Sequence, residues 1–182
     1  MNTKRYTLNM DVHFEWVRPT NAQGRLMKFI TVLSCVWFLS GCAGGYLDLY
    51  GQDGEKVGEC TAGFDWHPIG VTHSVDWVLN YCYELAISEG DIVKSVSDSS
   101  VIEKDYTYPA HSSGMPWDKK LAWSAFWSNE IDEVLYGYIV ADLENEYHLK
   151  ITQAEEQLLA SKISESQYEA IIKRAKYAFH GK

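Results

Sequence analysis

Residues 131–140 read IDEVLYGYIV, and residues 163–172 read ISESQYEAII. Both stretches place an isoleucine before a residue that caps helices well, Asp132 or Ser164, and a tyrosine four positions after that cap. An apolar residue before the cap packs against one at the fourth helical position in a hydrophobic staple, and Ser164 with Gln167 has the spacing of a capping box. The two stretches therefore predict two helices that begin in the same way.

The similarity extends outward from these stretches at a constant offset of 32 positions, as from 131 to 163. It predicts two helical hairpin repeats, 119–150 and 151–182, with four helices in all. The alternative is coincidence, because all amphipathic helices share one periodicity. If the repeats are real, truncating either staple isoleucine to alanine should cost about 1 to 3 kcal/mol. The identical pairs are Ala122/Ala154, Ile131/Ile163, Glu133/Glu165, Tyr136/Tyr168, Ile139/Ile171, His148/His180 and Lys150/Lys182.

Residues 158–169, LLASKISESQYE, resemble the SHOCT family, a short helical hairpin often found at the C-terminus of bacterial proteins. The family has a glycine before an Ile-Thr turn, followed by Glu-Phe and a lysine-rich helix. Here Ser161 or Lys162 takes the place of the glycine, Gln167-Tyr168 replaces Glu-Phe, and Ile171 falls near the family's lysine. The resemblance covers the last hairpin alone, implies a role in assembly and supplies no catalytic residue.

The preceding part of the chain predicts a small unit of strands and one helix. Residues 46–50 and 56–61 read as strands joined by the Asp-Gly turn at 52–55. Residues 72–88 predict a helix that stops at Gly90, and residues 92–96 predict a further short strand. Apolar residues recur along one face of that helix, at Val75, Val78, Leu79, Cys82 and Ala86. The predicted fold class is α+β, a strand-helix-strand module at 42–118 followed by the mainly α hairpin region at 119–182.

Residues 27–42 have the features of an export signal. Lys28 precedes an apolar run from Phe29 to Leu39, which is too short to span a bilayer but long enough for a signal peptide. Leu39-Ser40-Gly41-Cys42 resembles the lipobox of bacterial lipoproteins, which implies cleavage before Cys42 and lipid on its thiol. Ala43-Gly44-Gly45 then predicts a flexible linker. The alternative is a core strand that ends in Ser-Gly-Cys.

Residues 1–41 are thus expected to be an N-terminal extension plus signal peptide, with translation starting at Met27. The alternative is a long leader that is genuine and begins at Met1. In similar lipoproteins, aspartate after the lipidated cysteine favours retention in the inner membrane. Ala43 stands there, so we expect an outer-membrane protein that faces the periplasm.

Charge excludes one class of partner. The whole chain has 16 basic and 25 acidic residues. Removing residues 1–41 takes away five basic and two acidic ones, which leaves 11 and 23 and a net charge near −12. Such a surface repels phosphate backbones, so we expect no nucleic acid and attachment to the membrane through the lipid on Cys42.

Cys60 and Cys82 are the other cysteines of the mature chain. Two buried free thiols are one interpretation, because Cys82 lies on the inner face of its predicted helix. An oxidising periplasm favours a disulfide between them, which would contribute roughly 3 kcal/mol.

The residues that most resemble a catalytic or metal site lie at 64–73, where Asp65, His67 and His73 could act as acid, base or metal ligands. Metal binding needs three or four convergent ligands, and a structural loop with aromatic residues explains the same pattern. Gly-x-Ser-x-Gly, His-Glu-x-x-His and phosphate-loop motifs are missing from the sequence. We therefore assign no catalytic residue, no metal ligand and no cofactor.

The function expected from the sequence is an interaction or structural module of the envelope with a protein partner. Trp77, Tyr81, Trp123 and Trp127 could form an adhesive face, or they could belong to the core. The alternative is a periplasmic enzyme, or a binder of small ligands or sugars, that acts on envelope material.

Overall fold

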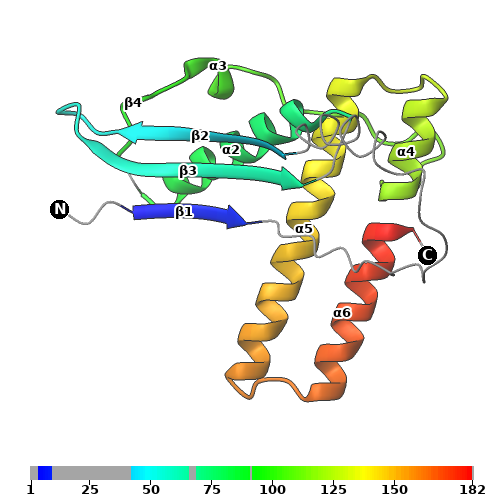
Figure 1. The fold of residues 1–182 in the computed structure, drawn as a ribbon. Helices are drawn as coiled ribbons and strands as arrows, with labels where there is room; N and C mark the ends of the chain where they lie inside the picture. The colour runs from blue at the N-terminus through cyan, green and yellow to red at the C-terminus, as the bar shows by residue number, and fades with distance from the viewer. Residues whose placement is uncertain (1–3, 10–41, 66–68, 91, 182) are drawn as a thin grey trace, which may run out of the picture.

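The computed structural model describes residues 4–9, 42–65, 69–90 and 92–181. Figure 1 shows a sheet with one helix across it, joined to a helical region whose last two helices project away from the sheet. The α+β class predicted from the sequence is confirmed. The elements are β1 (Lys4–Asn9), β2 (Cys42–Tyr50), β3 (Lys56–Asp65), α2 (Val71–Ser88), β4 (Ser95–Val96), α3 (Ser99–Ile102), α4 (Lys119–Trp127), α5 (Glu133–Leu159) and α6 (Glu165–His180).

The four described strands lie in the order β1-β3-β2-β4. β2 and β3 form the predicted antiparallel hairpin, and Gly54, at φ +76°, supplies the left-handed residue of its turn. β4 pairs with β2 over two residues only, so the strand expected at 92–96 is shorter than predicted. β1 runs parallel to β3 along its other edge, and nothing in its sequence had indicated this pairing.

One face of the sheet is covered by α2. The helix buries the side that the sequence predicted, against the strand residues Leu47, Leu49, Cys60 and Ala62. Gly45 lies under this helix, since a Cβ there would come within 2.7 Å of Val75 Cγ1. The expected flexible linker at 43–45 is therefore wrong. These residues belong to β2, and Gly45 allows α2 to approach the strand closely.

α2 also crosses α5 at close range. The Ser74 hydroxyl donates to the Gly137 carbonyl oxygen at 2.9 Å, and the Gly70 amide donates to Glu133 Oε1 at 3.0 Å. A Cβ on Gly137 would lie 2.5 Å from the Gly70 carbonyl oxygen. The two glycines thus let the backbones approach each other and join the sheet layer to the helical region.

The helical region contains three long helices, so the prediction of four is wrong. α5 is 27 residues long and runs through the boundary that was expected between residues 150 and 151. The reason lies in one aligned pair. Gly181 adopts φ +70° and ends α6, whereas Leu149 stands at the equivalent place and allows α5 to continue.

The two turns of the repeat nevertheless have the same geometry. Asn129 and Ser161, 32 positions apart, both adopt positive φ, 58° and 55°. The amides of Glu130 and Lys162 both bond to the carbonyl five residues earlier, the mark of a Schellman motif. Asp132 and Ser164 cap the next helix, and Ser164 and Gln167 complete the predicted capping box. One turn sequence is thus used twice.

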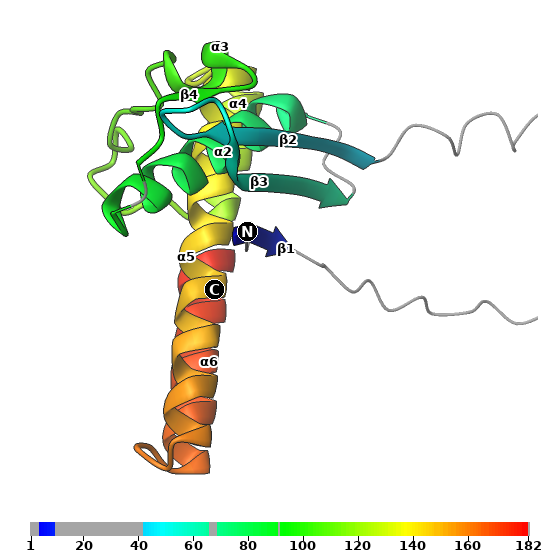
Figure 2. The same ribbon diagram turned by 90° about the vertical axis from the view of Figure 1, so that its left-hand side faces the viewer.

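Figures 1 and 2 show where the helices lie. α6 runs beside the second half of α5, and α4 lies beyond the C-terminal end of α6, on the same side of α5. Asp118, just before α4, is so close to Gly181 that a Cβ on the glycine would come within 2.5 Å of its carboxyl. α6 and α4 therefore follow each other almost end to end along α5.

Candidate functional site

The residues singled out at 64–73 do not form a described site. Asp65 is the last residue of β3, and Trp66, His67 and Pro68 lie outside the described residues. His73 lies on α2, half-buried, with its ring edge-on to Tyr138 of α5 at 6.4 Å. Within the described part of the chain, no group of three or more His, Cys, Asp or Glu residues could hold a metal ion. His73 thus contributes to packing between two helices.

The predicted Cys60–Cys82 bridge is present. The two Cα atoms lie 5.9 Å apart and both residues are buried. The bridge joins β3 to α2, so it fixes the helix on the sheet. Its role in the structure is stabilisation of this layer.

The aromatic residues divide between core and surface. Trp77 and Tyr81 stack on each other at 5.4 Å, and Trp77 packs against the core of the sheet layer. Trp123 and Trp127 lie on α4 with exposed fractions of 46% and 61%. Of the four aromatic residues singled out from the sequence, only the α4 pair is therefore exposed.

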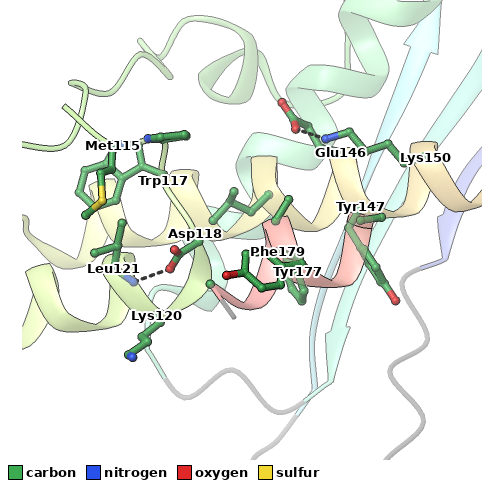
Figure 3. A pocket seen from close by; sticks show the side chains of 15 residues that line it. Met115, Trp117, Asp118, Lys120, Leu121, Glu146, Tyr147, Lys150, Tyr177 and Phe179 are labelled. Atoms are coloured by element: carbon green, nitrogen blue, oxygen red, sulfur yellow. Dashed lines mark hydrogen bonds and ion pairs between the residues drawn. The ribbon is translucent and has the colours of Figure 1, made fainter. Parts of the chain in front are cut away.

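A groove of about 660 Å³ opens where the start of α4, the middle of α5 and the end of α6 meet (Figure 3). Three segments that are distant in sequence line it. They include Met115, Trp117, Asp118, Lys120 and Leu121 around the start of α4, Leu143, Glu146, Tyr147 and Lys150 on α5, and Ala175, Tyr177, Ala178, Phe179 and Gly181 on α6.

The groove lies where α6 ends and α4 begins. Gly181 ends α6, and Asp118 starts α4 by accepting a hydrogen bond from the Leu121 amide at 2.7 Å. The break between the two helices leaves a gap beside the continuous α5. Trp117 is held over this gap by a 2.8 Å hydrogen bond from its indole nitrogen to the Pro109 carbonyl oxygen.

The interior of the groove is aromatic. Tyr147 and Phe179, which are equivalent residues of the two repeats, stack on each other with ring centroids 5.0 Å apart. The Lys119 ammonium lies 5.1 Å from the centre of the Phe179 ring and 3.3 Å from the buried Glu144 carboxylate. These contacts fix the aromatic pair in place, so this wall of the groove is preformed.

Its rim carries charges of both signs. Glu146 and Lys150 form an ion pair at 2.8 Å along α5, and Asp118 and Lys120 lie on the opposite side. Tyr177 and Met115 are 66% and 52% exposed. The groove therefore offers apolar area inside and polar partners at its border.

A half-buried polar contact lies on α5 just before the groove. The Tyr108 hydroxyl donates to Asp142 Oδ2. Burial raises the pKa of the Asp142 carboxyl, although the hydrogen bond from Tyr108 works in the opposite direction. Burial and the same bond raise the pKa of Tyr108, and burial raises that of Tyr136 to about 12. This contact fixes the loop before α4 against α5.

The residues that line the groove include no serine, cysteine or histidine. The groove offers apolar surface for burial and polar contacts at its rim. Sequence reasoning missed this groove because its three segments meet only in the folded chain. The one local signal was the pair of helix ends, Asp118 and Gly181.

The chain matches no protein-family model, no curated protein and no solved structure. No helix in the described ranges is both long and apolar enough to cross a membrane.

Proposed function

We propose that this protein is a lipid-anchored envelope protein that acts as an interaction module and binds a segment of a partner protein in the groove between α4, α5 and α6. The observation that carries the proposal is the groove itself, a preformed cavity with an aromatic interior and a rim of mixed charge. Such a border suits a peptide segment that buries apolar side chains and carries charges of its own.

The anchor part of the proposal rests on the sequence from Met27 to Cys42. Lipid on Cys42 would sit at the first residue of β2, and Gly45 three residues later is already packed under α2. The membrane attachment would therefore join the folded sheet without a spacer. With Ala43 after the cysteine, we place the protein on the outer membrane, facing the periplasm.

A second candidate is a binder of small ligands such as sugars. The volume of the groove, about 660 Å³, falls within the range of small-molecule sites, roughly 300 to 1,000 Å³. Exposed aromatic rings at its border, Tyr177 above all, fit both kinds of ligand.

The anchor is tested by labelling cells with a fatty acid. Wild type should take up label and lose its leader, whereas Cys42→Ser should remain an unlabelled precursor. Label on the variant, with cleavage at the same place, would contradict the lipid anchor.

The groove is tested with a photo-crosslinking amino acid at Tyr177, with the same group at the exposed Glu84 of α2 as the control position. We expect one envelope protein to be crosslinked from position 177 and not from 84. Ala178→Trp, which fills the groove from an exposed position, should abolish that product. A glycan adduct at 177 would favour the sugar binder, and a protein adduct that persists in Ala178→Trp would exclude the groove as the site.

A further inference from the structure

The outer edge of β3 is occupied by a strand from the leader. β1 pairs with it in parallel over six positions, from Lys4↔Gly58 to Asn9↔Gly63. β1 belongs to residues 1–41, which cleavage before Cys42 would remove. We propose that, in the mature chain, this edge of β3 binds an extended strand of an envelope partner, in the place that residues 4–9 take in the full-length chain. This proposal rests on the proposed function, because it needs the leader to be removed, and on translation from Met1, because β1 lies before Met27.

Removal of β1 leaves β3 at the edge of the sheet. The backbone groups of Gly58–Gly63 that face β1 would then have no partner from the described strands. Unpaired edges of this kind are templates for another strand, and peptide recognition by strand addition uses them. The register of β1 on β3 shows that this edge accepts a strand in one defined alignment.

The edge of β3 is held in a fixed position by β2 and α2. β2 pairs with β3 along its whole other side, and Cys60 is buried and disulfide-bonded to Cys82 on α2. A strand that docks here meets a backbone that is already fixed, so little conformational entropy is lost on the protein side.

β3 also lacks the features that usually protect an edge. It is ten residues long and contains no proline, and its single lysine, Lys56, stands at its first position. Lys56 is engaged with Asp48 and Glu59 at 2.6 Å and 2.5 Å. The six β3 positions that pair with β1 thus contain neither proline nor lysine.

The register indicates the chemistry of the partner strand. Tyr6 and Leu8 pair with the buried residues Cys60 and Ala62, and Lys4 pairs with Gly58, which is also buried. Arg5 pairs with Glu59. We expect a partner strand parallel to β3, with apolar residues two positions apart and a basic residue opposite Glu59, in keeping with the acidic charge of the mature chain.

The test starts from the full chain carrying Cys42→Ser, with a specific protease site inserted between residues 20 and 27. Amide hydrogen exchange at 58–63 is measured before cutting, after cutting and removal of the leader, and after adding a synthetic peptide of residues 1–12. We expect protection to fall at least tenfold when the leader is removed and to return when the peptide binds. A peptide with Thr7→Pro and Leu8→Pro, which cannot complete the ladder, should not restore it.

Three results would overturn the proposal. The peptide could fail to bind the cut protein, although β3 was protected before cutting. The sheet could unfold once the leader is removed, as seen by loss of protection in α2. The cut protein could form dimers with β3 protected in the absence of peptide, which would make a second copy the occupant. Because none of these measurements depends on lipid, they are independent of the fatty-acid labelling that tests the anchor.

Discussion

The two copies of the helical repeat share a turn but differ in their surroundings. Around 129–136 the turn is packed against the rest of the protein, and Ile131 and Tyr136 are 6% and 1% exposed. Around 161–168 the same turn lies at the far end of the projecting hairpin, where Ile163 and Tyr168 are only half-buried. Local sequence therefore determines the shape of the turn, while tertiary packing determines how much each side chain stabilises the fold.

The largest difference should appear at Gly137, whose counterpart in the second repeat is the exposed Glu169. Gly137→Ala places a methyl group against the Gly70 backbone, and we expect a loss of about 3 kcal/mol in the free energy of unfolding. Glu169→Ala is the matched control and should change it by less than about 0.5 kcal/mol. Urea midpoints measure both, and an unchanged Gly137→Ala would show that α2 and α5 are not in close contact.

The staple isoleucines should differ in the same direction. Ile131→Ala removes a buried side chain and should cost about 2.5 kcal/mol, whereas Ile163→Ala should cost about 1 kcal/mol. The sequence alone predicted a loss of about 1 to 3 kcal/mol for either substitution, and the burial of the two side chains now gives each substitution its own value. The same midpoints check it, and equal losses would mean that the far turn is covered in solution.

The helix caps should be equivalent, because capping is local. Asp132→Ala and Ser164→Ala each remove the acceptor of one amide, Leu135 or Gln167, and each should cost about 1 kcal/mol. Thermal unfolding of the two variants under one buffer provides the comparison. A silent Ser164→Ala would show that the second turn does not hold its capping box.

The two residues with positive φ, Asn129 and Ser161, should respond differently to replacement by glycine. Ser161→Gly relieves a conformation that serine tolerates poorly and should stabilise the protein by about 0.5 kcal/mol. Asn129→Gly should be close to neutral, because asparagine accepts this conformation. A destabilising Ser161→Gly would contradict the positive φ at that turn.

A pH effect should be confined to the first copy, where Asp142 is half-buried and its counterpart Arg174 is exposed. The raised pKa of Asp142 means that the folded state holds the proton to a higher pH than the unfolded state. Stability from this group is therefore present at low pH and lost as the pH rises through the folded pKa. Asp142→Asn should be more stable than wild type at neutral pH, and this advantage should shrink as the pH is lowered toward 4. An advantage that does not vary with pH would exclude the raised pKa.

Patterns carried by neighbouring residues were predictable from the sequence. The buried face of α2, the Asp-Gly hairpin, the Cys60–Cys82 pair and both caps of the repeat were all found from spacing and residue type. Prediction from the sequence pattern failed where a single residue changes the outcome. Gly181 ends α6, but its counterpart Leu149 lets α5 continue. The groove and the parallel pairing of β1 depend on segments that meet only after folding, so no local periodicity indicates them.

α5 has a mechanical consequence. Its 27 residues make a rod of about 40 Å, and the sequence has neither glycine nor proline between Tyr138 and Leu159 to act as a hinge. One end of this rod is locked against α2 through Gly70, and the other carries the tip of the α5–α6 hairpin. A load applied at the tip would therefore be transmitted as leverage on the sheet layer, in which β2 begins at Cys42, the attachment point proposed above. If the proposed function is right, a partner bound by this molecule would stay at a fixed distance from the membrane.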